Sequence, residues 1–131
     1  CILLSATHAA AGPSRLSPCP DSPNCVNSQS TDPARFIEPL RYTGDPAEAR
    51  QKLIDLLKDS NRTRLIRVET DYIHVEFRSF IFNFVDDVEF YFSSEDPIVH
   101  VRSASRTGYY DFGVNRRRVE RLRATFENSA K

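Results

Sequence analysis

Apolar and polar side chains alternate along most of residues 65–105 with a period of two. Such alternation is typical of β-strands that bury one face. It is interrupted at Thr70-Asp71 and at residues 94–97, and turns this short favour antiparallel pairing. The expected strands are residues 65–69, 72–79, 85–93 and 98–105. Their inward-facing side chains would be Ile66, Val68, Ile73, Val75, Phe77, Val88, Phe90, Phe92, Val99 and Val101.

Apolar residues at helical spacing predict two helices. The first follows Asp45, a suitable N-cap, and begins at Pro46, a suitable first residue. The second runs from about residue 115 to 128, with Asn115 as its N-cap. Their apolar stripes are Ala49, Leu53, Ile54 and Leu57, and Val119, Leu122 and Phe126. The expected fold is therefore α+β: a four-stranded antiparallel sheet, two helices packed on one face, and an N-terminal Pro-rich arm.

One aromatic stretch does not fit the alternation. Phe80, Phe82 and Phe84 share the parity of the polar residues His74 and Glu76, so an unbroken strand would point them at solvent. Three explanations stay open. A β-bulge shifts the phase, the Pro-rich arm covers that end of the sheet, or the aromatics form an exposed patch that binds a partner.

The first residues of the chain resemble a targeting segment. Cys1-Ile2-Leu3-Leu4 precede a run of small residues up to Gly12, and the chain contains no Met, so we expect it to be processed or incomplete. The run reads as the end of a secretion signal with its cleavage site; alternatively Cys1 is the lipidated first residue of a lipoprotein, or the segment is a disordered tail. We expect residues 1–18 to be a signal remnant or a membrane tether, and residues 19–131 to be one exported α+β domain in the periplasm or envelope.

Two cysteines flank a short Pro-rich loop. Five residues separate Cys19 from Cys25 and no second pair follows, which does not match the spacing of metal sites. A Cys19–Cys25 disulfide suits an exported protein, and two free thiols are the alternative. We expect neither a metal nor a cofactor.

The charge balance and the absence of known catalytic motifs exclude some classes of function. The chain has 18 basic and 18 acidic residues, and this balance argues against nucleic-acid binding driven by bulk charge. It contains no Gly-x-Ser-x-Gly, no phosphate-cradling Gly-rich loop and no His pair at metal-binding spacing on a helix. No catalytic reaction can be assigned from motifs.

The outward side of the predicted sheet carries polar residues in rows. The expected pairings place His74, Tyr91 and His100 in one row, and Glu76, Glu89 and Arg102 in the next. Two carboxylates beside an arginine can form an acid–base site, because each raises the pKa of the other. The alternative is a solvated ladder of salt bridges. In either case we expect Glu89 and Arg102 to form a cross-strand pair.

Three arginines begin the second predicted helix. Residues 116–118 would place positive charge where the helix dipole is already positive, so negative charge must compensate. The expected internal partners are Asp86, Asp87, Glu89 and Asp111, with at least one bidentate pair. An external anion is the other possibility, with Arg102 or Arg106 left partly open for it. The candidate anion-binding residues are Arg102, Ser103, Ser105, Arg106, Asn115 and Arg118.

Several motifs resemble one family when they are read together. They are Cys19-Pro20-Asp21-Ser22-Pro23-Asn24-Cys25-Val26-Asn27-Ser28, then Phe84-Val85-Asp86-Asp87-Val88-Glu89-Phe90, then Arg102-Ser103-Ala104-Ser105-Arg106 followed by Gly108, Asp111, Gly113, Asn115, Arg118 and Val119-Glu120. This order resembles the family called domain of unknown function 1499, with Asn27 as a minor departure. The resemblance implies a bacterial envelope protein, often a lipoprotein, or a plastid-lumen protein. It implies no reaction and no catalytic residue.

Three functions remain in competition. The leading hypothesis is a non-enzymatic envelope domain that binds a partner protein or a small anionic ligand. The second is an enzyme that uses His74, Glu76, Glu89 or His100. The third is a structural accessory of an envelope complex, contacting its partner through Phe80–Phe84. The position of the main concave site distinguishes them.

Overall fold

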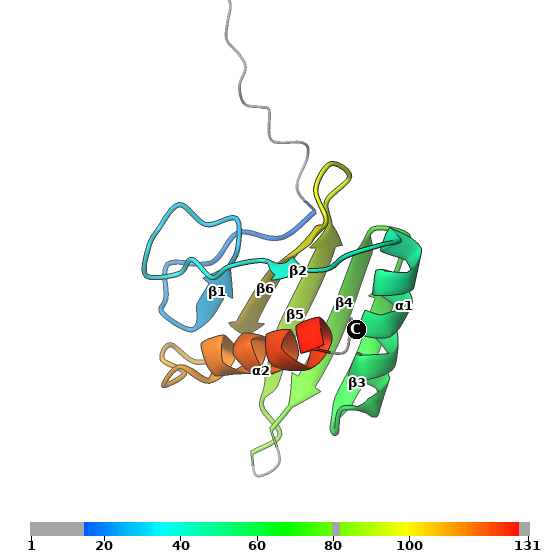
Figure 1. The fold of residues 1–131 in the computed structure, drawn as a ribbon. Coiled ribbons are helices and arrows are strands. Elements are labelled where there is room, and N and C mark those ends of the chain that lie inside the picture. Colours follow the sequence, from blue (N-terminus) through cyan, green and yellow to red (C-terminus); the bar gives the residue numbers. More distant parts are fainter. Residues whose placement is uncertain (1–14, 80–81, 129–131) are drawn as a thin grey trace, which may run out of the picture.

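The computed structural model describes residues 15–79 and 82–128 (Figure 1). Most of the expected signal remnant or tether, and Phe80, lie outside these residues. Along the described chain the strands are β1 (Cys25–Asn27), β2 (Leu40–Arg41), β3 (Thr63–Val68), β4 (Tyr72–Arg78), β5 (Val85–Phe92) and β6 (Ile98–Ser105). The helices are α1 (Pro46–Asp59) and α2 (Val114–Asn128). Neither helix is long and apolar enough to cross a membrane.

The sheet has six strands, so the expectation of four is wrong. The antiparallel order is β1-β6-β5-β4-β3, and β2 also pairs with β6. Cys25 pairs with Ala104 and Leu40 with Val99, so β1 and β2 share the outer edge of β6. These two strands have three and two residues and lie in a Pro-rich segment without alternation. They form because the edge of β6 offers unpaired backbone groups, which no local pattern reveals.

Both helices cover the same face of the sheet (Figure 1). The core joins the predicted stripes of α1 and α2 to inward side chains of β4, β5 and β6. Two members of the predicted inward set are wrong, since Ile66 and Val68 are exposed. A bulge between Leu65 and Arg67 shifts the phase of β3, and Leu65 packs on the core instead.

The predicted strand register is correct in the β5–β6 hairpin and wrong in the β4–β5 hairpin. In the β5–β6 hairpin, Glu89 lies opposite Arg102 as expected. In the β4–β5 hairpin, His74 lies opposite Glu89 rather than Tyr91, which is a shift of two residues. In the sequence, Asp96-Pro97 marks the turn between β5 and β6. No residue marks the centre of the loop between β4 and β5 in the same way, so the register of that hairpin could not be read from its turn.

Helix α2 begins differently from the prediction. The carboxylate of Asp111 accepts hydrogen bonds from the backbone N–H of Gly113 at 2.9 Å and of Asn115 at 3.0 Å. Asp111 therefore caps the helix, and Asn115 is a fully buried residue inside the first turn. In α1, Asp45 and Pro46 occupy the predicted cap and first positions, but the Asp45 side chain makes no capping hydrogen bond.

Candidate functional site

Four of the six candidate anion-binding residues meet on the helix-facing side of the sheet. We call Ser103, Ser105, Asn115 and Arg118 the β6–α2 network. The Ser103 hydroxyl donates to Oδ1 of Asn115 at 2.6 Å, and Nη1 of Arg118 donates to the same oxygen at 2.9 Å. Nδ2 of Asn115 donates to Ser105 Oγ at 3.1 Å. These contacts fix the start of α2 on β6.

The same network holds the segment that carries the disulfide. Nδ2 of Asn115 also lies 2.7 Å from Oδ2 of Asp111 and 3.1 Å from the Asn24 carbonyl. Nδ2 of Asn24 donates to the Gly108 carbonyl at 2.8 Å. One buried side chain therefore ties β6, α2 and the arm together, and most polar atoms of the network are used inside the protein.

Of the three arginines at the start of α2, Arg118 is compensated from inside by one of the predicted carboxylates. Nη2 of Arg118 lies 2.7 Å from Oδ2 of Asp86, and both side chains are nearly buried. Burial lowers the pKa of Arg118, and Asp86 opposes this effect. The guanidinium also lies 4.9 Å from the centre of the Phe77 ring, a favourable cation–π geometry.

Arg102 and Arg106 lie on the other side of the sheet, which we call the outward face. They are separated from Ser103 and Ser105 because successive residues of a strand point to opposite faces. Arg106 remains partly exposed at 45%, but two of its three nitrogens are engaged. Nε and Nη2 form a bidentate pair with Asp87 at 3.0 and 2.7 Å, and Nη2 also contacts Glu76 at 2.6 Å.

This pairing changes the acidity of the carboxyl groups around Arg106. The hydrogen bond from Arg106 lowers the pKa of Glu76 although burial opposes it. Burial raises the pKa of Asp87, but hydrogen bonds from Arg106 and His74 lower it by more. Nε2 of His74 lies 2.9 Å from Oδ1 of Asp87. The groups therefore form a ladder of ion pairs with ionised carboxylates.

A second polar cluster surrounds Glu89 under the Pro-rich arm. Glu89 contacts Arg102 at 3.2 Å, as predicted, and accepts hydrogen bonds from the Tyr72 hydroxyl and the Ser17 backbone N–H. Burial, with Glu89 beside it, raises the pKa of Tyr72 to about 12. Arg102 also donates to the Pro18 carbonyl. The arm thus covers this cluster, and the described rings Phe82 and Phe84 remain exposed.

The two histidines of the enzyme hypothesis lie apart in the sheet. Tyr91 lies opposite His100 as predicted, but His74 is displaced to the Glu89 row. Nδ1 of His100 lies 3.0 Å from Ser28 Oγ, and burial lowers the pKa of this imidazole. Within the described residues no cluster of His, Cys, Asp and Glu is arranged to hold a metal ion.

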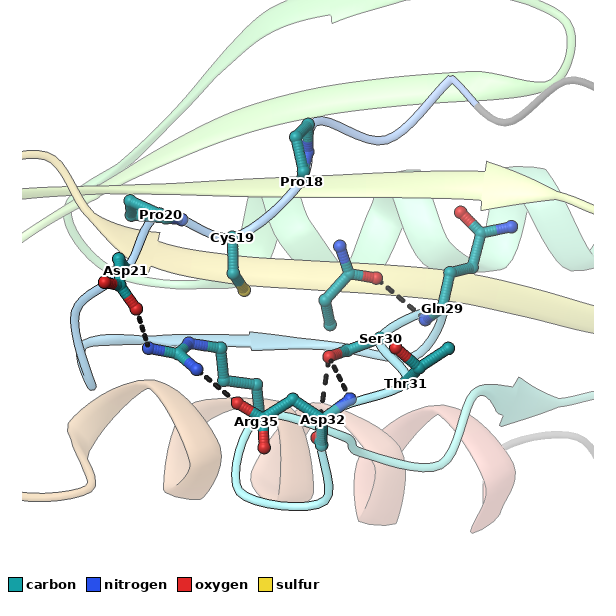
Figure 2. A pocket seen from close by; sticks show the side chains of 10 residues that line it. Pro18, Cys19, Pro20, Asp21, Gln29, Ser30, Thr31, Asp32 and Arg35 are labelled. Atoms are coloured by element: carbon teal, nitrogen blue, oxygen red, sulfur yellow. Dashed lines mark hydrogen bonds and ion pairs between the residues drawn. The ribbon is translucent and has the colours of Figure 1, made fainter.

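A polar hollow of about 380 Å³ lies beside the predicted disulfide, which joins Cys19 to Cys25. Figure 2 shows Pro18, Cys19 and Pro20 along one wall and the turn from Gln29 to Asp32 along the other. Arg35 crosses between the walls, paired with Asp32 and, at 3.8 Å, with Asp21. Its other donors contact the Ser22 carbonyl. Because Arg35 is used to join the walls, the hollow offers no free cation.

A larger groove, which we call the α1–α2 groove, has a volume of about 800 Å³. It lies between the end of α1, the end of β4 and the middle of α2. Leu56, Phe77 and Leu122 provide apolar surface, and Lys52, Arg118 and Arg121 provide positive charge. The remaining lining residues are Asp59, Ser60, Asn61 and Thr125. The volume is in the range of small-molecule sites, although seven of the ten lining residues are polar or charged.

Sequence reasoning found one residue of this groove, Arg118, and missed the rest. Phe77 and Leu122 were predicted only as core residues, and Leu56 and Arg121 carry no motif that marks them. Their meeting depends on the angle at which α1 and α2 cross the sheet. Arg121 lies one turn after Arg118 in the sequence, and this spacing is the only local sign of a shared face.

Fold and site together define a class: an α+β protein whose helices form a basic, partly apolar groove over one face of an antiparallel sheet. Residues 15–126 match the family described as "Protein of unknown function (DUF1499)". The match covers most of the chain, so the protein belongs to this family, and the resemblance of its motifs is confirmed. A comparison with curated proteins found no match.

Proposed function

We propose that this protein is an exported, non-enzymatic binding domain whose α1–α2 groove takes an amphipathic anion. The ligand would carry an apolar chain or ring together with a carboxylate or phosphate group. The observation that carries the proposal is the juxtaposition of apolar and cationic side chains in one groove of suitable volume. A purely polar anion would leave the apolar wall exposed to water.

The cations of the groove have different roles. Arg118 already has Asp86 as its partner, so its charge is largely compensated. Arg121 forms no ion pair with the described carboxylates and is exposed. Lys52 stands over the Phe126 ring at 5.5 Å. Arg121 and Lys52 are therefore the groups best able to receive the anionic end of the ligand, while Leu56 and Phe77 contact its apolar part.

The outward face supports the enzyme hypothesis less well. Its acids and histidines all have partners within the protein, and among the described residues they line neither the α1–α2 groove nor the hollow beside the disulfide. A general acid or base needs access to substrate. The ion-pair ladder explains the same residues without a reaction.

Export is supported by the Cys19–Cys25 disulfide, because such bonds persist in oxidising compartments. We place the protein in the periplasm or envelope, or in the lumen if the chain comes from a plastid lineage. Residues 1–18 would be a signal remnant or, if Cys1 is lipidated, a membrane tether. Incorporation of labelled palmitate that Cys1→Ser abolishes would identify the tether.

Calorimetry and thermal unfolding with four small probes test the groove. Decanoate and decyl phosphate combine chain and charge, decanol has the chain alone, and inorganic phosphate has the charge alone. We expect the first two to bind and raise the melting temperature, and the last two to have little effect. Arg121→Glu and Leu56→Gln should weaken binding, whereas Arg117→Glu, on the same helix outside the groove, should not. Equal binding by all variants would contradict the proposal.

A further inference from the structure

Five aromatic side chains are exposed at one end of the sheet. Their exposed fractions lie between 58% and 75%, and no other large apolar side chain among the described residues exceeds 42%. We call this set the aromatic end: Phe82, Phe84, Tyr109, Tyr110 and Phe112. Burying such side chains is favourable, so a cluster of them left in water indicates a contact surface.

The aromatic end comes from two loops that leave the same end of the sheet (Figure 1). One follows β4 and the other follows β6. The N–H of Arg106 donates to the Val85 carbonyl at 2.9 Å, so the bases of the loops are joined. Within each loop the rings pack together: the ring centres of Phe82 and Phe84 are 5.5 Å apart, and those of Tyr110 and Phe112 are 4.8 Å apart.

Positive charge adjoins these rings. Arg116 and Arg117 follow Phe112 at the start of α2, and neither forms an ion pair with a described carboxylate. Nη1 of Arg117 donates to the Phe112 carbonyl at 2.9 Å, which holds this cation against the aromatic loop.

Exposed acids gather at the opposite end of the molecule. They lie in the β5–β6 turn and at the start of α1: Glu95, Asp96, Asp45 and Glu48. Basic residues lie at this end as well, since Arg50 lines a hollow with Asp45 and Arg41 pairs with Ile98 beside the β5–β6 turn.

We propose that the aromatic end docks on the surface of an anionic lipid bilayer. Aromatic rings favour the boundary between headgroups and acyl chains, and nearby arginines bind anionic headgroups. A folded protein partner usually receives aromatic anchors in matching pockets around a compact patch. Here the rings stand on two projecting loops, and a fluid bilayer can close around such loops without a preformed match.

Trp fluorescence can report this contact directly, because the chain contains no Trp. Phe84→Trp and Phe112→Trp each create a single reporter at the aromatic end, and Ile66→Trp creates a matched one on β3. With phosphatidylglycerol–phosphatidylcholine vesicles, we expect a blue shift and quenching by brominated lipid for the first two reporters. The Ile66→Trp reporter should not respond. An equal response of all three, or no response at the aromatic end, would overturn the proposal.

Vesicle sedimentation of the full chain gives an independent measurement. Phe84→Ser with Phe112→Ser should reduce partitioning into anionic vesicles by about tenfold or more. Arg117→Glu should also weaken it, and Arg41→Glu, an exposed arginine elsewhere, should not. High salt should reduce binding, and pure phosphatidylcholine should bind less. Because residues 1–4 are also apolar, binding that survives the aromatic double variant would assign the membrane contact to them and contradict the proposal.

Two further outcomes separate this proposal from others. A wild-type dimer that Phe112→Ser dissociates, without vesicle binding, would assign the rings to contact between copies and overturn lipid docking. Leu56→Gln should impair the groove but leave vesicle binding unchanged, so failure of one proposal does not imply failure of the other. All substituted rings are exposed, so the variants should fold and melt near the wild-type temperature.

Discussion

Ser103 on β6 and Asn115 on α2 are both fully buried, and their side chains are joined by a hydrogen bond of 2.6 Å. Oδ1 of Asn115 also accepts a hydrogen bond from Arg118. Nδ2 of Asn115 donates to Asp111, Ser105 and the Asn24 carbonyl. Asn115 therefore supplies the hydrogen bonds that the buried polar groups around it need. The family motifs therefore converge on a structural junction.

Asn115→Ala should destabilise the protein by about 3 kcal/mol, because it leaves several buried groups without partners at once. Thermal or denaturant unfolding measures the change. Asn128→Ala, at the exposed end of the same helix, is the matched control and should stay within about 0.5 kcal/mol of wild type. Equal effects of the two substitutions would show that the junction contributes little to stability.

Arg118→Ala should cost about 3–5 kcal/mol, because it leaves Asp86 charged and unpaired in a nearly buried site. Replacing both partners, as in Arg118→Met with Asp86→Leu, should recover much of the loss. Arg117→Ala is the exposed control on the same helix turn. If the double variant is no more stable than Arg118→Ala, then the effect of Arg118 does not arise from its pairing with Asp86.

Removing the Cys19–Cys25 disulfide by a double substitution to Ala should cost about 2 kcal/mol, since the closed loop is short. The main structural effect should be a freer arm, seen as faster amide exchange at residues 15–28. Alkylation of the unreduced, unfolded chain should label Cys1 only. Labelling of all three cysteines would show that the bond does not form in solution.

The Asp87–Arg106 pair should make stability depend on pH in the acid range. The pKa of Asp87 is lowered in the folded protein, so its stabilising effect is present at neutral pH and is lost as pH falls below about 4. Asp87→Asn should therefore cost about 1 kcal/mol at pH 7, since half-exposed Arg106 is screened by water, and much less at pH 3. Unfolding at both pH values measures the difference, which Arg106→Ala should abolish.

Much of the fold was predictable because its signals are local. The boundaries of β4, β5 and β6 agree with the alternation within about one residue, and the stripes of α1 and α2 match the core. The start of α1 at Pro46 and the turn at Asp96-Pro97 are determined by prolines that restrict their own backbone. The bulge after Leu65 was not predictable, because it depends on how an edge strand meets its single neighbour.

The sequence by itself determined the α+β class, the family, the disulfide and the Glu89–Arg102 pair. The disulfide and the pair follow from a short loop and a short turn, and the family follows from several motifs in a fixed order along the chain. Only the tertiary structure decided that Ser103 and Arg102 serve opposite faces of the sheet, that β1 and β2 complete the edge of β6, and that Arg121 joins Leu56 in a groove. These relationships depend on pairing register and helix crossing, which are set by the packing of distant segments and leave no periodic trace along the chain.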